Sequence, residues 1–231
     1  IPVIVIQGRG VSAGIVQGRL HCFHRVGAAA VKRAGADPTE ELARLAEAQA
    51  QAVGQLEALA ERCKREMGPE AALVFSTHAM LLEDESLLEY VRDLITRENC
   101  CAEYAVQMAG ETFAATFEAM DDAYMRERGS DVMDVTWRML RSLAGAGAGG
   151  AELDSPAIVA ACDLNPTEFI ELDRSQVLAI VTQRDSKNSH AAIMAQLLHI
   201  PTVCNLGDDL RADYHGRTAQ VDGSAGTLIV F

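Results

Sequence analysis

The sequence predicts an α/β fold, namely a discontinuous α/β domain interrupted by an inserted all-α helical bundle. Three observations support this prediction. Two β-rich apolar runs separated by glycines open the chain, in PVIVIQGRGVSAGIVQGRLHCF. Apolar residues at helical spacing then dominate residues 37–143. After about residue 156, short strand-like runs alternate with short helical stretches, which is typical of an α/β domain. We expect the first strands to pair with these later strands, because the helices between them offer no strand partners.

The insertion is predicted to begin with one long helix, DPTEELARLAEAQAQAVGQLEALAERCKREMG. Asp37 is a suitable N-cap, Pro38 occupies the first helical position, and Gly68 follows the last turn. One face of this helix is apolar and is expected to pack on another helix. The residues that form this face at roughly helical spacing are Leu42, Leu45, Val53, Leu56 and Leu59.

Further helical stretches complete the insertion and predict a bundle. They are expected near residues 70–82, 85–97 and 101–143. The last stretch is expected to break around Asp121 or Gly129. The glycine-rich segment LAGAGAGGAELDSP then loses periodicity and is typical of a linker. We therefore expect residues 1–32 plus 144–231 to form the α/β domain and residues 33–143 to form the bundle.

The composition argues against several classes of protein. The formal net charge is −13, and residues 33–143 hold 22 acids against 11 bases. Nucleic-acid binding is disfavoured, because it needs clustered Lys and Arg. The acidic middle suits a basic partner, with an ordinary solvated helical face as the alternative. No apolar run approaches the roughly 20 residues of a membrane helix, and the N-terminus lacks a secretory signal pattern. A cytoplasmic location with no membrane partner is the resulting expectation.

The cysteines give no sign of a metal site. They stand at positions 22, 63, 100, 101, 162 and 204, without a C-x-x-C pair and without a His/Cys cluster at zinc spacing. Reduced and mostly buried thiols are therefore expected. No metal ligand is predicted in this chain.

The stretch SKNSHAAIMAQLLHIPTVCN carries the candidate site at the start of a short predicted helix. Ser189 is suited to cap this helix. An apolar stripe is expected to dock the helix on the sheet, and its residues are Ile193, Met194, Leu197 and Leu198. His190 would then lie at the rim, beside unpaired backbone N–H groups and the positive end of the helix dipole, where a phosphate is stabilised. Lys187 and Arg184 could add positive charge.

These residues alone leave the role of His190 open between a structural or solvated histidine, a metal ligand and a covalent nucleophile. A metal role is disfavoured because His199 lies at the opposite end of the helix, and no H-x-x-E or H-x-x-x-H pair is present. A serine nucleophile at Ser189 is unsupported, because the G-x-S-x-G pattern is missing.

A family resemblance favours the nucleophile. SHAAIMAQLLHIPTV resembles the phosphohistidine signature of phosphoenolpyruvate-utilising enzymes. Other segments are similar to stretches of one member, enzyme I of the bacterial sugar phosphotransferase system. These are the opening GRGVSAGIVQGRL, THAMLLEDESLLEYV and EAMDDAYMRERGSDVMDVTWRMLRSLAG of the insertion, and ACDLNPTEFIELD. The resemblance covers essentially the whole chain, with the motifs in the same order.

The resemblance implies a swivelling phosphohistidine domain in which His190 is phosphorylated, with Lys187 and Ser189 beside it. The phosphoryl group would originate from phosphoenolpyruvate and pass to a histidine of the phosphocarrier protein HPr, as in a phosphoenolpyruvate-protein phosphotransferase. Phosphoenolpyruvate and magnesium would bind a C-terminal barrel domain outside this sequence. The chain would thus be the N-terminal half only, with no cofactor of its own, and its partners would be HPr and that domain.

The partner surface of the family maps onto seven residues of the insertion. They are Glu70, His78, Met80, Leu81, Glu85, Phe117 and Arg128. Exposed methionine and leucine ringed by acids suit a small partner with an apolar patch and a basic rim. Ordinary core packing of Met80 and Leu81 is the alternative.

The sequence departs from the family at the active loop, which leaves a second function open. Asp185, Ser186, Lys187 and Asn188 replace the family's Gly-Gly-Arg-Thr before Ser-His. Loss of the glycines removes easy access to positive φ, and Lys lacks the bidentate fork of Arg. Phe169 stands where the family commonly has a threonine that contacts the active histidine. The alternative function is a protein-interaction or regulatory module on the enzyme I scaffold with weakened or specialised phosphotransfer.

Overall fold

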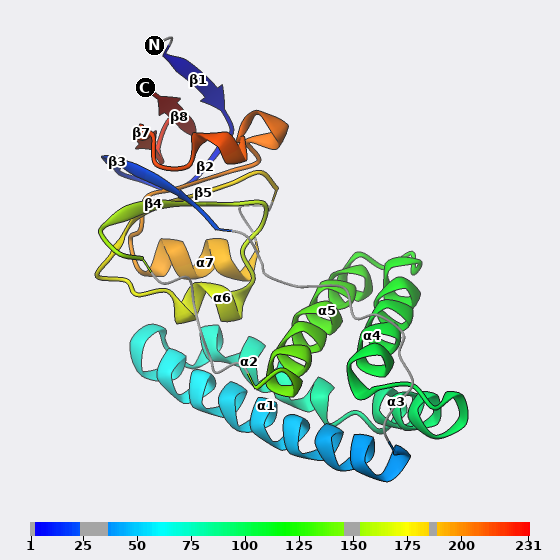
Figure 1. Cartoon of the computed structure of the whole chain (residues 1–231). Coiled ribbons are helices and arrows are strands. Elements are labelled where there is room, and N and C mark those ends of the chain that lie inside the picture. The colour runs from blue at the N-terminus through cyan, green and yellow to red at the C-terminus, as the bar shows by residue number, and fades with distance from the viewer. Residues whose placement is uncertain (1–2, 24–36, 146–152, 185–188) are drawn as a thin grey trace. The chain divides into compact units, whose positions relative to one another are not determined.

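The computed structural model describes residues 3–23, 37–145, 153–184 and 189–231 (Figure 1). Two compact units make up the chain. The sheet unit consists of Ile1–Arg25, Cys63–Ala71 and Gly149–Phe231, and the helical unit consists of Val26–Arg62 and Ala72–Ala148. A mixed α/β domain with an inserted helical bundle is therefore confirmed as the fold class.

The described residues of the sheet unit form one eight-stranded mixed sheet, in the order β1-β8-β7-β3-β4-β5-β6-β2. The strands are β1 (Ile4–Gln7), β2 (Arg9–Ser12), β3 (Ile15–Cys22), β4 (Ala157–Ala161), β5 (Val177–Thr182), β6 (Thr202–Cys204), β7 (Thr218–Asp222) and β8 (Thr227–Val230). The expected pairing of early with late strands is confirmed. β1 is antiparallel to β8, β2 is antiparallel to β6, and β3 lies between antiparallel β7 and parallel β4.

The core of this unit follows from the two-residue period of its strands. β3 alternates between partly buried and exposed positions until Leu20, which is 1% exposed. β4 is buried along its whole length, as expected of a strand in the parallel part of a sheet. The centre of the core contains Ile158, Val181, Val203, Val221 and Leu228.

Two short helices accompany the sheet, α6 (Pro166–Glu171) and α7 (His190–Leu197), together with the 3-10 turns η1 (Gly207–Asp209) and η2 (Ala212–Tyr214). Figure 1 shows α6 and α7 on the same face of the sheet. The α6 helix begins with a capping box. Asn165 accepts a hydrogen bond from the backbone N–H of Glu168, and the Glu168 carboxylate accepts one from the backbone N–H of Asn165.

The predicted helices of the insertion are all present. They are α1 (Pro38–Met67), α2 (Pro69–Leu82), α3 (Glu85–Glu98), α4 (Ala102–Glu118) and α5 (Ala123–Leu143). The backbone N–H of Thr39 donates to the Asp37 carboxylate at 2.7 Å, so the predicted N-cap is confirmed. Gly68 ends α1 with a φ of 97°, a left-handed conformation that glycine adopts at little cost.

The helical stretch predicted over residues 101–143 is broken between α4 and α5. The break lies near Asp121, the first of the two expected positions, and not at Gly129. Asp122 caps α5 by accepting a hydrogen bond from the backbone N–H of Met125 at 3.0 Å. Gly129 instead lies inside α5 in close contact with α4, since a Cβ there would be 2.8 Å from Glu118 Cγ. The glycine serves helix packing, so the expectation of a break at this position is wrong.

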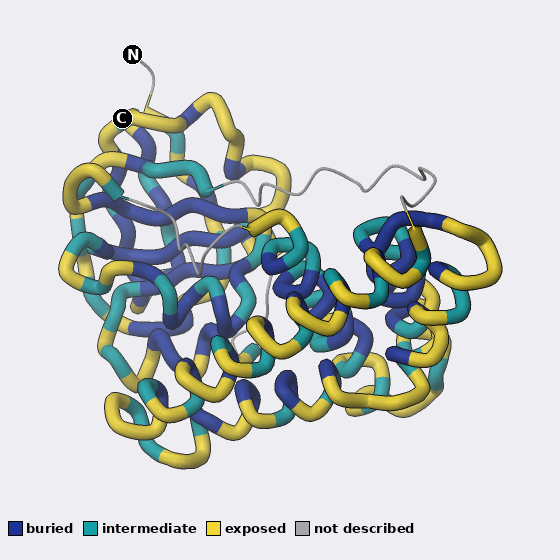
Figure 2. Tube along the Cα trace, turned by 60° about the horizontal axis from the view of Figure 1, so that its bottom comes forward, coloured by how far each residue is buried: buried dark blue, intermediate teal, exposed yellow. Residues whose placement is uncertain are grey.

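Figure 2 shows buried and exposed positions alternating along the helical segments. In α1, Leu45, Leu56 and Leu59 are buried as predicted, whereas Leu42 and Val53 are only partly buried. No helix in the described part of the chain combines the length and the apolarity that crossing a membrane requires.

Candidate functional site

His190 occupies the first position of α7, in the connection that follows strand β5. Ser189 is the N-cap, and its Oγ accepts a hydrogen bond from the backbone N–H of Ala192 at 3.2 Å, which confirms the predicted cap. The side chain of His190 is exposed. An imidazole in this position can be approached by another protein, and the N–H groups of the first helical turn can stabilise an anion beside it.

The face that α7 buries differs from the prediction. Met194 is 1% exposed, but Ile193 and Leu197 are 42% and 49% exposed. The helix instead buries a small-residue face made of Ala191, Ala192 and Ala195 together with Met194. The predicted stripe is therefore wrong for Ile193 and Leu197. Successive residues are about 100° apart around a helix, so these two side chains share the solvent face with His190.

Contacts beneath α7 hold the helix in place. The side-chain amide of Gln196 donates to the backbone oxygen of Val11 in β2 at 2.9 Å. Phe169 of α6 is 2% exposed and lines the same small cavity as Ser189 and Ala192. A phenyl ring therefore lines this cavity, and it can neither donate nor accept a conventional hydrogen bond.

The loop before the helix is only partly described. Asp185, Ser186, Lys187 and Asn188 lie outside the described residues, so the proposed role of Lys187 stays a prediction. The strand end that leads into the loop is anchored at Arg184. The backbone oxygen of this residue accepts hydrogen bonds from Thr182 Oγ1 at 2.9 Å and from the backbone N–H of Asn205 at 3.1 Å.

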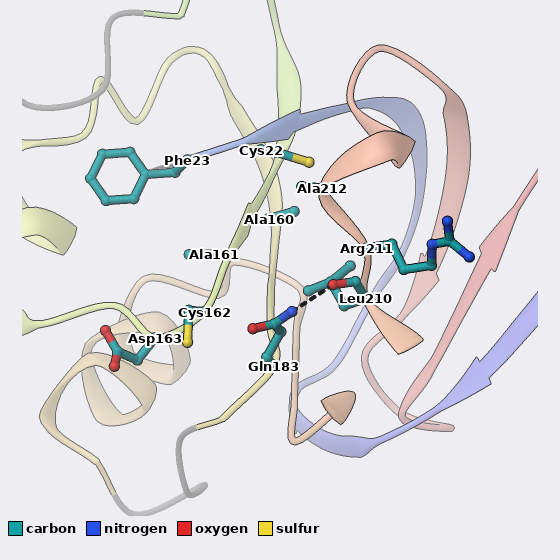
Figure 3. Close-up of a pocket in the computed structure, with 10 residues that line it drawn as sticks. All are labelled: Cys22, Phe23, Ala160, Ala161, Cys162, Asp163, Gln183, Leu210, Arg211 and Ala212. Carbon is teal, nitrogen blue, oxygen red and sulfur yellow. Dashed lines mark hydrogen bonds between the residues drawn. The ribbon is translucent and has the colours of Figure 1, made fainter. Parts of the chain in front are cut away.

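A pocket of about 250 Å³ lies at the carboxyl ends of β3 and β4 (Figure 3). Its lining comes from β3 and β4 with the residues after them, from Gln183, and from the chain around η2. The lining residues are Cys22, Phe23, Ala160, Ala161, Cys162, Asp163, Gln183, Leu210, Arg211 and Ala212. The Gln183 side chain is fixed by a 2.7 Å hydrogen bond to the backbone oxygen of Leu210.

This pocket is poorly suited to a phosphorylated anion. Arg211 is the one cation among the lining residues that the structure describes, and its guanidinium is engaged by Asp213 at 2.7 and 3.0 Å. Figure 3 shows its side chain extending away from the other lining side chains. Asp163 adds a negative charge to the wall. The pKa of the Cys22 thiol is raised by burial and by the nearby Asp213 carboxylate, which favours the neutral thiol.

The predicted partner residues are exposed to different extents. In the helical unit, Met80 is 71% exposed, which excludes an ordinary core role, and Glu85 is also exposed. Leu81 and Phe117 are partly buried. Glu70 is exposed in the first turn of α2, in the part of that helix that belongs to the sheet unit.

His78 does not offer its ring to a partner as predicted, because it is 1% exposed. Its Nε2 lies 3.1 Å from Oδ1 of Asp131 in α5. Asp131 in turn lies 3.7 Å from Arg128, a predicted partner residue whose side chain is 26% exposed. Sequence reasoning missed Asp131, although its position three residues after Arg128 on one helix face is a signal that could have found it.

One group of side chains in the described residues could hold a metal ion. His78, Asp131 and Asp134 offer ligand atoms that lie within 4.8 Å of one another. Nitrogen and carboxylate oxygen ligands of this kind suit a transition metal such as zinc. Arg128 already places a positive charge beside Asp131, however, and this charge would repel a cation.

Two family models match the sequence. The PEP-utilising enzyme, N-terminal model matches residues 7–128, and the PEP-utilising enzyme, mobile domain model matches residues 153–226. The phosphoenolpyruvate-protein phosphotransferases of Geobacillus stearothermophilus and Bacillus subtilis strain 168 are 35% and 33% identical to the chain, in each case over 97% of its length. The chain spans about two fifths of these relatives, 39% and 40% respectively.

Solved structures show the same similarity. The solution NMR structure of an enzyme I protein matches with a TM-score of 0.74 and 30% identity, over 97% of this chain and 92% of that one. A structure of the N-terminal domain of Enzyme 1 - Nitrogen matches with a TM-score of 0.70 and 28% identity, over 97% and 93% of the two chains.

Proposed function

Because the chain belongs to the phosphoenolpyruvate-utilising enzyme family, as the N-terminal half of enzyme I, we propose that it is a phosphoryl carrier in which His190 passes phosphate to HPr. The observation that carries this proposal is the exposed imidazole at the capped N-terminus of α7, inside the segment that matches the mobile domain. Histidine is a covalent nucleophile, and helix N-termini stabilise phosphate oxygens.

The proposed step is phosphoryl transfer between two imidazoles. In the forward direction, an unprotonated ring nitrogen of the HPr histidine attacks the phosphorus carried by His190. A new N–P bond forms, the bond to His190 breaks, and the electron pair of that bond stays on the His190 nitrogen. The backbone N–H groups at the start of α7 face the charge of the phosphate.

The ultimate donor in this proposal is phosphoenolpyruvate, bound with magnesium by a C-terminal domain of the full-length protein. Two observations support placing the donor site outside this chain. The chain spans about two fifths of its curated relatives, and the 250 Å³ pocket of the sheet unit presents an engaged arginine and an acidic wall. No cofactor is proposed for the chain itself.

A second candidate function is a protein-interaction or regulatory module with weakened or specialised phosphotransfer. The buried Phe169 favours it, because a phenyl ring cannot contribute the hydrogen bond that a threonine hydroxyl would. The altered residues Asp185–Asn188 also support this second function, although they lie outside the described residues.

Intact-mass measurement after incubation with phosphorylated HPr separates the two functions. The carrier function predicts a gain of one phosphoryl group that His190→Ala abolishes. The matched control is His199→Asn, which replaces an exposed histidine just beyond α7 whose φ is 54° with a residue that tolerates this conformation. This control should retain the gain. No gain in the unaltered chain, with HPr binding retained, would support the second function instead.

A further inference from the structure

A chain of polar contacts in the helical unit runs from a buried residue to the surface. It begins at His78 in α2, whose Nε2 lies 3.1 Å from Asp131 Oδ1. The second oxygen of Asp131 lies 3.7 Å from the guanidinium of Arg128. That guanidinium lies 5.0 Å from the ring centroid of Tyr124 and donates a hydrogen bond to the Tyr124 hydroxyl. Four side chains are thereby connected across α2 and α5.

The inner end of this series of contacts, at His78, is costly for folding. A polar ring that is 1% exposed loses its hydration, and a pair of apolar residues in place of a buried polar pair is commonly neutral or stabilising. What the contact supplies is geometry, because the hydrogen bond to Asp131 restricts how α2 and α5 can rotate against each other. Met80 follows His78 by two residues on α2, which places its exposed side chain about 200° around the helix from His78, so the contact orients the helix that carries Met80.

The outer end of this series of contacts restricts the flexible side chain of Arg128. An exposed arginine must normally give up side-chain entropy when it binds, which weakens the complex. Arg128 is held by Asp131 on one side and by Tyr124 on the other before any partner arrives. Tyr124 is itself 62% exposed, and tyrosine and arginine are the residue types that dominate binding hot spots.

We propose that Asp131 is a positioning residue and Tyr124 a contact residue of the HPr-docking surface. The inference rests on the proposed function. The occupant is HPr, which would cover Met80 with its apolar patch and place a carboxylate or backbone carbonyl against Arg128. A divalent cation bound by His78, Asp131 and Asp134 is the competing use of the network, and the charge of Arg128 beside Asp131 opposes it.

A double-mutant cycle on HPr binding tests the proposal, with dissociation constants from isothermal titration calorimetry. Arg128→Ala is expected to weaken binding by about tenfold, a typical hot-spot loss. Asp131→Asn should weaken it by about fivefold, and Arg128→Ala should cost no more than about twofold further in that background. This non-additivity is the signature of positioning, which a merely structural role would not produce. Asp131→Glu, which keeps a carboxylate, should recover part of the loss.

The cycle has a matched control and a direct test of the contact residue. Asp93→Asn removes a carboxylate that lies 3.4 Å from Arg97 on α3, and it should leave HPr binding unchanged. Tyr124→Ala should weaken binding, whereas Tyr124→Phe, which keeps the ring, should weaken it less. Circular dichroism of each variant checks that it is folded.

The outcomes separate this inference from the function on which it rests. No binding of HPr by the unaltered chain would overturn both. Binding with additive losses at Arg128 and Asp131, or with no loss in Asp131→Asn, would overturn the inference alone. Zinc titration of the unaltered chain provides the remaining outcome, because stoichiometric zinc uptake abolished by His78→Gln would assign the network to a metal instead.

Discussion

The side chain of Phe169 shows how one residue limits the chemistry available to a neighbouring helix. It is 2% exposed and lines a small cavity together with Ser189 and Ala192 of the α7 N-terminus, to which it presents only hydrocarbon. Phe169 therefore offers no hydrogen bond to a phosphoryl group on His190, whereas the backbone N–H groups of the first turn of α7 can. This is a physical reason to expect slower phosphotransfer than in a relative with a hydroxyl at this position.

The thiols of Cys22 and Cys162 are predicted to react at different rates, although both line the same pocket. The thiolate is the reactive form. Burial and the Asp213 carboxylate raise the pKa of Cys22, so at any pH below that pKa a smaller fraction of Cys22 is ionised than of an unperturbed thiol. Cys162 is exposed. Iodoacetamide labelling followed by peptide mass mapping from pH 7 to 9 should therefore modify Cys162 first.

The rise of Cys22 labelling with pH should lag behind that of an unperturbed thiol. Cys162→Ser is the control, because it should remove the fast phase and leave the slow one. Equal rates for the two residues at neutral pH would contradict the prediction.

The contact between α4 and α5 depends on glycine at two places where the helices meet. A Cβ at Gly110 would overlap Oγ1 of Thr136, and Gly129 faces Glu118 at a Cβ distance of 2.8 Å. Thr136 cannot easily turn away, because its hydroxyl donates to the backbone oxygen of Val132 at 2.7 Å. Glycine here lowers helix propensity but permits close packing of the two helices.

Gly110→Ala and Gly54→Ala should therefore change stability in opposite directions. At Gly54 in α1 nothing lies within 4 Å of the new methyl group, so this substitution should stabilise the protein by about 0.5–1 kcal/mol. At Gly110 the overlap with Thr136 should outweigh the gain in propensity and destabilise the protein by about 1–2 kcal/mol. Urea denaturation measures both, and a stabilised Gly110→Ala variant would show that α4 and α5 do not meet closely there.

The sheet unit as a whole is assembled from distant parts of the chain. Strand β3 lies between β7 and β4, and it brings the buried Leu20 into the core that the later strands form. The segment Cys63–Ala71 also belongs to this unit, and an ion pair between Glu66 and Arg174 joins it to the chain before β5. The segment matched by the mobile-domain model is thus only part of the folded unit.

A fragment of residues 153–231 is accordingly predicted not to fold alone. Without β3 it loses the partner of both β4 and β7, and unpaired strands in the middle of a sheet leave backbone groups and apolar side chains exposed. Amide dispersion in the NMR spectrum of the labelled fragment measures this. Dispersion should be poor for the fragment and should increase when a peptide of residues 3–23 is added. A well-dispersed spectrum of the fragment alone would contradict the prediction.

The amino-acid sequence by itself determined the local features of this protein. The start of α1 at Asp37 and Pro38, its end at Gly68 and the cap at Ser189 were all predictable, because capping and helix propensity depend on residues within about one turn. The family motifs likewise identified His190 as the candidate nucleophile.

Burial and contact between distant residues were decided only when the chain folded. α7 buries Met194 and its alanines and exposes Ile193 and Leu197, because β2 and α6 pack against that face of the helix. His78 became a buried partner of Asp131, 53 residues later, because α5 packs against it, whereas the family resemblance had placed His78 on the partner surface. Hydropathy indicates which side chains can be buried. Which face of a helix is buried depends on the neighbours that tertiary packing brings against it.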